Sequence, residues 1–192
     1  MRRLVLGFSI IILLLTTISL YPEQTIKKKI EKLEKKLETV SGREKIDVLN
    51  EISYEYYYLS PGKAIEYGNH ALELSKKLKE QKGEATALRN ISRGYIGQGS
   101  YEKALDYAQK SLKIFKEIGD KKGIAGNLNN IGVIYYILSN YENALEYHLK
   151  SLKIEEEIGN KRGIAASLNN IGIIYKELSN YLVLVSFPLV LG

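Results

Sequence analysis

Residues 101–180 consist of two consecutive segments of nearly the same sequence. Segments 101–140 and 141–180 align without a gap, and a direct count gives 27 identical positions of 40. A repeat of this period is typical of stacked supersecondary units, each of which buries its apolar face only against its neighbours. The sequence therefore predicts a stacked array, and any function must be inferred from the repeat rather than from isolated motifs.

Each repeat contains two amphipathic helical patterns, which we call helix A and helix B. Apolar or small residues recur at intervals of three and four, as they do on one side of a helix. In helix A these residues are Leu128, Ile131, Tyr135 and Leu138, and in helix B they are Ala104, Tyr107, Ser111, Leu112 and Ile114. Neither helix can bury its apolar side alone, so each repeat is predicted to be a helical hairpin that stacks on the next.

The ends of both helices carry residues that favour helix termination or capping. Short polar side chains accept hydrogen bonds from free backbone N–H groups at a helix start, and glycine adopts the left-handed conformation that follows many helix ends. The predicted positions are Ser100 and Asn140 before helix B, Gly119 and Gly159 after it, and Asp120 and Asn160 before the next helix A.

Small residues are predicted to set the distance between packed helices. Gly132 and Gly172 lie within helix A, and Ala104 and Ala144 lie within helix B. A bulky side chain at such a contact would overpack it and cost roughly 1–3 kcal/mol.

The order Leu-x-x-Ile-Gly-x-x-Tyr in helix A, followed by Tyr and x-x-Ala in helix B, resembles the tetratricopeptide repeat (TPR). A 40-residue unit with a Leu-Asn-Asn-Ile-Gly core is similar to the longer variety found in kinesin light chains and many bacterial signalling proteins. The resemblance covers about residues 41–180. It implies an all-α fold, a right-handed superhelical solenoid of antiparallel helix pairs that binds proteins or peptides.

The rest of the chain extends this array at its N-terminal side. Hairpins are predicted over residues 43–80, 83–118 and 120–158, with a partial fourth over 160–180 whose helix A ends at Leu178. Residues 23–40 form a charged helix with an apolar seam. We expect it to cap the first hairpin, because terminal repeats need such a cover; dimerisation through a short coiled coil is the alternative.

Residues 1–20 have the features of an export signal. Two arginines precede an apolar run, and small residues follow at Thr17 and Ser19, as in a secretory signal peptide cleaved near Ser19. An uncleaved membrane anchor over residues 4–20 is the alternative, because the run is only slightly shorter than a membrane span. Either predicts an exported, periplasmic or extracytoplasmic protein that meets the membrane only through this segment. The chain has no cysteine, which excludes a lipoprotein.

Residues 181–192 depart from the repeat. Tyr181 stands where a helix B begins, but an apolar segment follows that contains Pro188 and is too short to span a membrane. We therefore expect helix A of the fourth hairpin to be partly uncovered. Our interpretation is that the chain is a truncated or frame-shifted piece of a longer protein.

The sequence offers no support for catalysis or for a bound metal or cofactor. The two histidines, His70 and His148, occupy non-equivalent repeat positions and are expected at the surface or in packing. No phosphate-binding or nucleophile motif is found, and carboxylates alternate with lysines on exposed helical positions. The net charge of +6 comes from interspersed charges rather than from a basic face, which argues against nucleic acid as a partner.

A helical wheel of helix A places a second stripe opposite its apolar side. Stacked A helices would align these stripes on a concave surface, where Asn side chains could bind a peptide backbone through their amide donor and acceptor. The stripe comprises Thr86, Asn90, Arg93 and Gly97, then Gly126, Asn130, Val133 and Ile137, then Ala166, Asn170, Ile173 and Glu177.

The TPR resemblance implies that Asn90, Asn130 and Asn170 are peptide-groove positions, with Asn129 and Asn169 beside them. The predicted peptide-binding set is Asn90, Arg93, Asn129, Asn130, Val133, Asn169, Asn170 and Ile173. The alternative is that these asparagines bond one another, or the backbone, across adjacent repeats. Apolar residues at 133, 137 and 173 favour the groove, because they suggest a surface that a partner covers.

The first functional hypothesis is thus a non-enzymatic interaction module that binds an extended peptide or a partner's segment. The second is the sensor portion of a truncated membrane signalling protein of the histidine kinase or nucleotide cyclase type. The third is an inert gene fragment that misfolds through its apolar tail.

Overall fold

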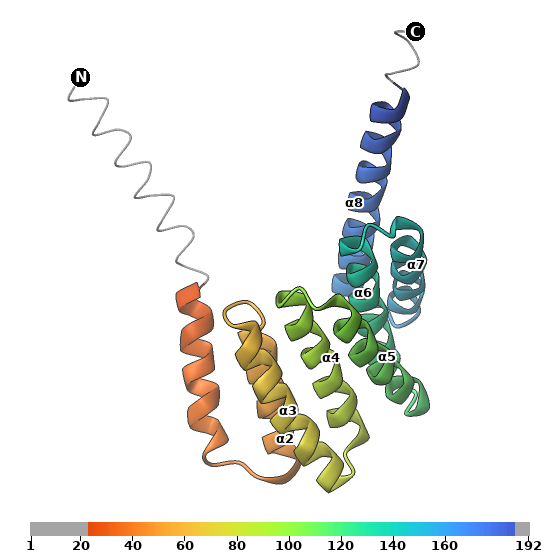
Figure 1. Ribbon diagram of the computed structural model, residues 1–192. Helices are drawn as coiled ribbons and strands as arrows, with labels where there is room; N and C mark the ends of the chain where they lie inside the picture. Colours follow the sequence, from red (N-terminus) through yellow and green to blue (C-terminus); the bar gives the residue numbers. More distant parts are fainter. Residues whose placement is uncertain (1–22, 187–192) are drawn as a thin grey trace, which may run out of the picture.

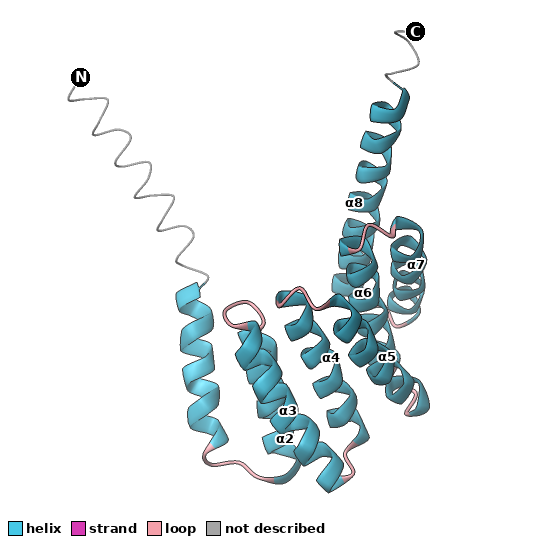
Figure 2. Ribbon diagram, in the orientation of Figure 1, coloured by secondary structure: helices cyan, strands magenta, loops and turns pink. Residues whose placement is uncertain are grey.

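The computed structural model describes residues 23–186, and every regular element in that range is a helix (Figure 2). A helix over residues 23–37 comes first. It is followed by α2 (Gly42–Tyr56), α3 (Pro61–Leu78), α4 (Gln81–Gly97), α5 (Tyr101–Glu117), α6 (Lys121–Ile137), α7 (Tyr141–Glu157) and α8 (Lys161–Ser186). The predicted export signal over residues 1–20 lies outside the described residues. None of the helices within 23–186 has both the length and the apolar character that crossing a membrane requires.

The helices form consecutive antiparallel hairpins that lie side by side along the molecule (Figure 1). Helices α2, α4, α6 and α8 are the A helices, and each packs against the A helix before and after it. In the described chain, the B helices α3, α5 and α7 pack against A helices but not against one another. The array therefore curves toward the A helices, which form its concave side.

Similar contacts recur along the array, both between successive hairpins and within each one. Buried alanines on the B helices, such as Ala104 and Ala108, let them approach Ile131 and Ile134 of α6 closely. A tyrosine pair stacks beside these contacts in each hairpin, with ring centroids 5.3–5.4 Å apart: Tyr56–Tyr67, Tyr95–Tyr107 and Tyr135–Tyr147. Leu138 was predicted on the apolar side, but it is 44% exposed because α6 ends at Ile137 and Leu138 follows at the helix end.

The predicted helix ends are confirmed at most of the positions. Gly119 and Gly159 both adopt φ +67°, the left-handed conformation that glycine tolerates. The side chains of Asp120 and Asn140 accept hydrogen bonds from the backbone N–H groups of residues 123 and 143. Ser100 occupies the N-cap position of α5 as predicted, but its side chain makes no capping bond.

The two helix-A glycines differ in what surrounds them. A Cβ on Gly132 would lie 2.7 Å from Cε1 of His148, so this glycine does set the α6–α7 contact, as predicted. A Cβ on Gly172 would meet nothing within 4 Å. The prediction was wrong there, because no helix of the described chain covers that side of α8.

The helix over residues 23–37 packs against the first hairpin, where Ile30 and Leu33 join a buried cluster with Val48, Ile52 and Tyr56. At the other end of the array, α8 does not end near Leu178 but continues to Ser186, past the ends of its neighbours (Figure 1). In the preceding repeat the chain turns at Ser139, which has φ +57°. The free-energy cost of this left-handed turn is compensated in that repeat by the packing of α7. Residues after 180 lack the helix-B pattern, so continued helical hydrogen bonding is favoured.

Candidate functional site

Three hollows follow one another along the A-helix face. The first, of about 510 Å³, lies between the helix over 23–37, α2 and α4. The second, of about 400 Å³, lies between α4 and α6, and the third, of about 260 Å³, lies between α6 and α8. The first two share the lining residues Tyr54, Lys82, Thr86 and Arg89, so they form one continuous groove.

One row of equivalent repeat positions crosses all three hollows. Tyr54, Arg93, Val133 and Ile173 occupy the same place on α2, α4, α6 and α8, respectively. Tyr54 and Arg93 line the second hollow, whereas Val133 and Ile173 line the third. The concave wall therefore changes from aromatic and cationic near the N-terminus to apolar near α8.

The structure brings five of the eight predicted site residues to these hollows. Asn90 lines the first hollow, and the other four are Arg93, Val133, Asn170 and Ile173. Three predicted residues line none of them: Asn129, Asn130 and Asn169. Whether any of the eight contacts a peptide stays a prediction.

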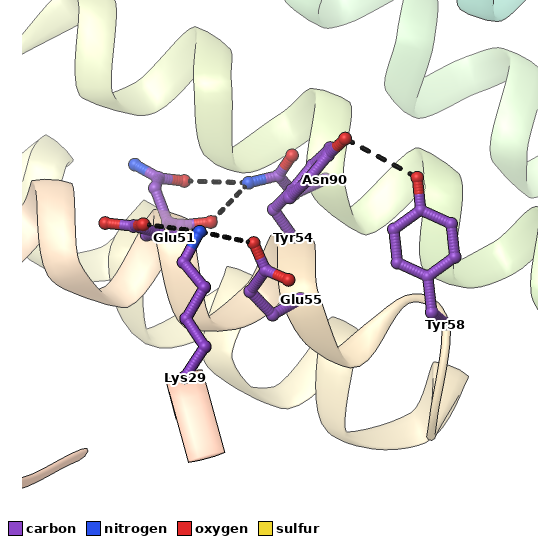
Figure 3. Close-up of polar contacts among 7 residues, drawn as sticks. Lys29, Glu51, Tyr54, Glu55, Tyr58 and Asn90 are labelled. Atoms are coloured by element: carbon purple, nitrogen blue, oxygen red, sulfur yellow. Dashed lines mark hydrogen bonds and ion pairs between the residues drawn. The ribbon is translucent and has the colours of Figure 1, made fainter. Parts of the chain in front are cut away.

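The asparagines bond across adjacent A helices. Asn90 Nδ2 donates to the backbone oxygen of Asn50 over 2.8 Å (Figure 3), and Asn130 Nδ2 donates to Ser92 Oγ over 2.9 Å. Asn170 Nδ2 donates to Asn129 Oδ1 over 2.9 Å. The hydrogen bonds of the structural alternative are thus present, and Asn90 and Asn130 are buried rather than on a solvated face. The reason is that an A helix is flanked by A helices on both sides.

These bonds use the amide nitrogens and leave acceptors unused. Within the described chain, the carboxamide oxygens of Asn90 and Asn170 accept no hydrogen bond, although both residues line hollows. One asparagine can therefore both tie two repeats together and present its oxygen to an N–H donor in the groove.

His148 forms part of the third hollow. Its Nδ1 lies 3.0 Å from Asn129 Oδ1, which can only accept, so Nδ1 carries the ring proton. The same oxygen accepts from Asn170, and it thereby joins α7, α6 and α8. Burial lowers the pKa of His148 to about 4, which keeps the ring neutral near pH 7. The sequence left open whether His148 lies at the surface or in packing, and the structure shows it packed in the interior.

The first hollow contains charges that are already paired. Lys29 lies between Glu51 and Glu55, with Nζ–Oε1 distances of 2.9 and 2.7 Å (Figure 3). The hydrogen bond to Glu55 is the main reason that the pKa of Lys29 rises to about 12. Beside this trio, the hydroxyl groups of Tyr54 and Tyr58 lie 3.5 Å apart. That bond raises the pKa of Tyr58 to about 12.

Arg89 and Arg93 are different, because each guanidinium rests on an aromatic ring. Arg89 lies over Phe115, 5.3 Å from the ring centroid, and Arg93 lies over Tyr54 at 5.1 Å. Arg89 Nε is shielded from solvent and has no hydrogen-bond partner in the described chain. Burial, with repulsion from Arg93, lowers the pKa of Arg89 to about 10, so it remains charged at pH 7.

Sequence reasoning missed Arg89, Tyr54 and His148 as lining residues. Arg89 lies one position before Asn90, outside the predicted stripe of Thr86, Asn90, Arg93 and Gly97. Tyr54 lies in the first hairpin, for which no concave stripe was predicted. Because Tyr54 is one repeat before Arg93, the repeat period could have identified it. No signal in the sequence shows that Gly132 makes room for the His148 ring.

Metal binding has no support in the described part of the chain. No group of three or more His, Cys, Asp or Glu side chains in residues 23–186 is arranged to hold an ion.

The comparisons agree with this architecture. The family model of the tetratricopeptide repeat matches residues 61–117 and 123–182, which is more than half of the chain. The chain belongs to the tetratricopeptide repeat family. A search of curated proteins finds no match.

Several solved TPR-like structures share the fold. The apo form of RapI is 27% identical, with a TM-score of 0.64 over 80% of this chain and 57% of RapI. A Rap protein complexed with competence and sporulation factor is 22% identical, with a TM-score of 0.75 over 86% of this chain and 48% of that protein. NprR in complex with its cognate peptide NprX is 22% identical, with a TM-score of 0.68 over 81% of this chain and 46% of NprR. The TPR chain thus spans about half the length of these proteins.

Proposed function

We propose that this TPR chain is a non-enzymatic interaction module that binds an extended segment of a partner protein along its A-helix face. The main support is the row of three hollows between successive helices of the A-helix face, because hollows aligned in a row suit an extended chain better than a compact ligand. The unused oxygens of Asn90 and Asn170 could accept hydrogen bonds from the backbone of that segment.

Two of the similar structures lend support. The Rap protein was solved with competence and sporulation factor and NprR with its cognate peptide. Both identities are 22%, so they support the fold directly and peptide binding by analogy.

Exposed apolar side chains in the third hollow add a second line of support. Ile173 is 39% exposed and Ile137 is 37% exposed, and both line that hollow. Their burial by a bound side chain would contribute about 25 cal/mol per Å² of apolar surface removed from water.

The test is selection of displayed random peptides on the purified full chain, followed by affinity measurements with the selected peptides. Ile173→Asp should abolish binding by placing a charge in the third hollow. Leu149→Asp is the matched control, because Leu149 is a 47% exposed apolar residue on the B helix α7. The proposal fails if no peptide is selected, or if both variants bind the selected peptides equally well.

We also propose that the chain is exported, on the basis of the basic and apolar segment in residues 1–20. N-terminal sequencing of the protein from a membrane-enclosed expression host tests this. A mature N-terminus near residue 20, or recovery in the membrane fraction, supports export. An intact N-terminus in the cytoplasmic fraction contradicts it.

A further inference from the structure

Arg89 and Arg93 lie one turn apart on α4, and neither forms a close ion pair in the described chain. Within residues 23–186, no carboxylate lies within 4.0 Å of either guanidinium. The nearby Asp120 is paired with Lys82 over 2.9 Å and with the Gly123 N–H. Two like charges held close together without an anion are unfavourable, and this indicates a place that an anionic ligand would stabilise.

The aromatic contacts leave the binding edges of both arginines open. Each guanidinium carbon lies over a ring, Phe115 for Arg89 and Tyr54 for Arg93, and within the described chain neither guanidinium donates a hydrogen bond. The guanidinium N–H groups form the fork that matches the two oxygens of a carboxylate. Arg89 Nε is already out of water and lacks an acceptor, so a ligand oxygen would relieve an existing cost.

The surroundings favour a single carboxylate over a polyanion. Acids line the same pair of hollows among the cations Lys29, Arg43, Lys82 and Lys122; they are Asp47, Glu51, Glu55, Glu80, Asp120 and Glu155. A nucleic acid would bring its closely spaced phosphates against these acids. One acidic side chain flanked by neutral residues would reach the arginines without that repulsion.

The third hollow, farther along the A-helix face, has the opposite character. Val133, Tyr136, Ile137 and Ile173 line the third hollow, and its polar members are His148, kept neutral by burial, and Asn170. No charged side chain lines it. Its volume of about 260 Å³ suits one large apolar side chain.

The distance between the arginines and the third hollow follows from the repeat. Neighbouring packed helices lie about 9 Å apart, so Arg93 and the midpoint between Val133 and Ile173 are separated by about 14 Å. An extended chain rises about 3.3 Å per residue, which makes this distance about four residues.

We propose that the A-helix face selects extended peptides with one acidic residue, bound by Arg89 and Arg93, about four positions from one large apolar residue, bound in the third hollow. This specifies the ligand of the proposed function and rests on it. The proposed function requires only that some peptide bind the A-helix face, so it can hold when this selectivity does not.

The test uses the peptides selected on the full chain. They should share an Asp or Glu about four positions from a Leu, Ile, Met or Phe. For one such peptide, Arg93→Gln should weaken binding about tenfold or more, as expected for a charge-assisted hydrogen bond. The same variant should change the affinity of the Asp→Asn peptide less than twofold. Lys113→Gln, on the B helix α5 and 79% exposed at its side chain, should leave both affinities unchanged.

Two further measurements separate this effect from misfolding. The Asp→Asn change is made in the peptide, so its expected loss on the wild-type chain needs no protein variant. Arg93→Lys keeps the charge but not the fork and should bind with intermediate affinity. The selectivity is wrong if selected peptides compete for the groove but lack the acidic residue, or if Arg93→Gln weakens both peptides equally. If no peptide is selected, the proposed function fails as well.

Discussion

Gly132 of α6 faces the imidazole ring of His148 on α7 so closely that a Cβ would lie 2.7–2.9 Å from three of its ring atoms. One repeat earlier the same two positions are Ser92 and Ala108, both buried. In the third hairpin, the helix-A residue is therefore smaller (Gly132 in place of serine). The helix-B residue is larger (His148 in place of alanine). The smaller residue on helix A makes room for the ring, which lines the third hollow.

Gly132→Ala should reduce the free energy of unfolding by roughly 1–3 kcal/mol, because the added methyl overpacks the contact with a ring that is itself buried. The matched control is Gly172→Ala on α8, where a Cβ meets nothing within 4 Å. That variant should gain up to about 1 kcal/mol from the higher helix propensity of alanine. Urea denaturation followed by circular dichroism measures both. Equal effects of the two substitutions would contradict this account.

The double variant Gly132→Ser with His148→Ala installs the pair found in the preceding repeat. It should be more stable than Gly132→Ala alone, because Ser92 and Ala108 already fit these positions one hairpin earlier. A double variant less stable than Gly132→Ala would show that the two sites are not interchangeable between repeats. Thermal unfolding of the wild type, Gly132→Ala and the double variant decides between these outcomes.

Acid should destabilise the chain in part through His148. Its pKa is about 4 in the folded state because of burial, against an ordinary value of 6.5. Between these values the unfolded chain binds more protons, so the free energy of unfolding should fall as pH drops from about 6.5 to about 4. Below pH 4 this contribution no longer changes.

Carboxylates also titrate near the lower end of that range, so the measurement compares variants. The pH dependence of the urea midpoint between pH 7 and pH 4 should be shallower in His148→Gln than in the wild type. His70→Gln is the control, because His70 is exposed on α3, and it should follow the wild-type curve. Parallel curves for the wild type and His148→Gln would exclude the role of burial.

Asn90→Ala and Asn130→Ala should each cost about 1–3 kcal/mol of stability, because each removes a buried hydrogen bond between adjacent repeats. Asn169→Ala should cost less than about 0.5 kcal/mol, because Asn169 is exposed. Chemical denaturation of the three variants tests this. If Asn90→Ala instead leaves stability unchanged and weakens peptide binding, its amide acts mainly on the ligand.

The repeat period determined most of what could be predicted about the fold. The 40-residue spacing placed the A and B helices, and the capping roles of Asp120 and Asn140 followed from local backbone chemistry. Burial on the A helices was harder to predict, because an ideal wheel treats one helix in isolation. Asn130 was assigned to an open face, yet it is buried and bonds to Ser92 of the preceding A helix. The shape of the groove depends on such neighbours, which is why Arg89 and Tyr54 were missed.

Helix capping offers a last contrast between two positions that look alike in sequence. Asp120 and Ser100 both precede a helix, but only Asp120 accepts a hydrogen bond from the helix backbone, over 2.9 Å. Burial alone would raise the pKa of Asp120, but bonds from Gly123 N–H and Lys82 outweigh it and hold that pKa below its usual value. Asp120→Ala should therefore lower the free energy of unfolding by about 1–2 kcal/mol, and Ser100→Ala by less than about 0.5 kcal/mol. Asp120→Asn keeps a capping oxygen and loses only the partly exposed ion pair, so it should fall between them. Urea midpoints rank the three, and a loss for Ser100→Ala as large as that for Asp120→Ala would contradict the assignment of the cap.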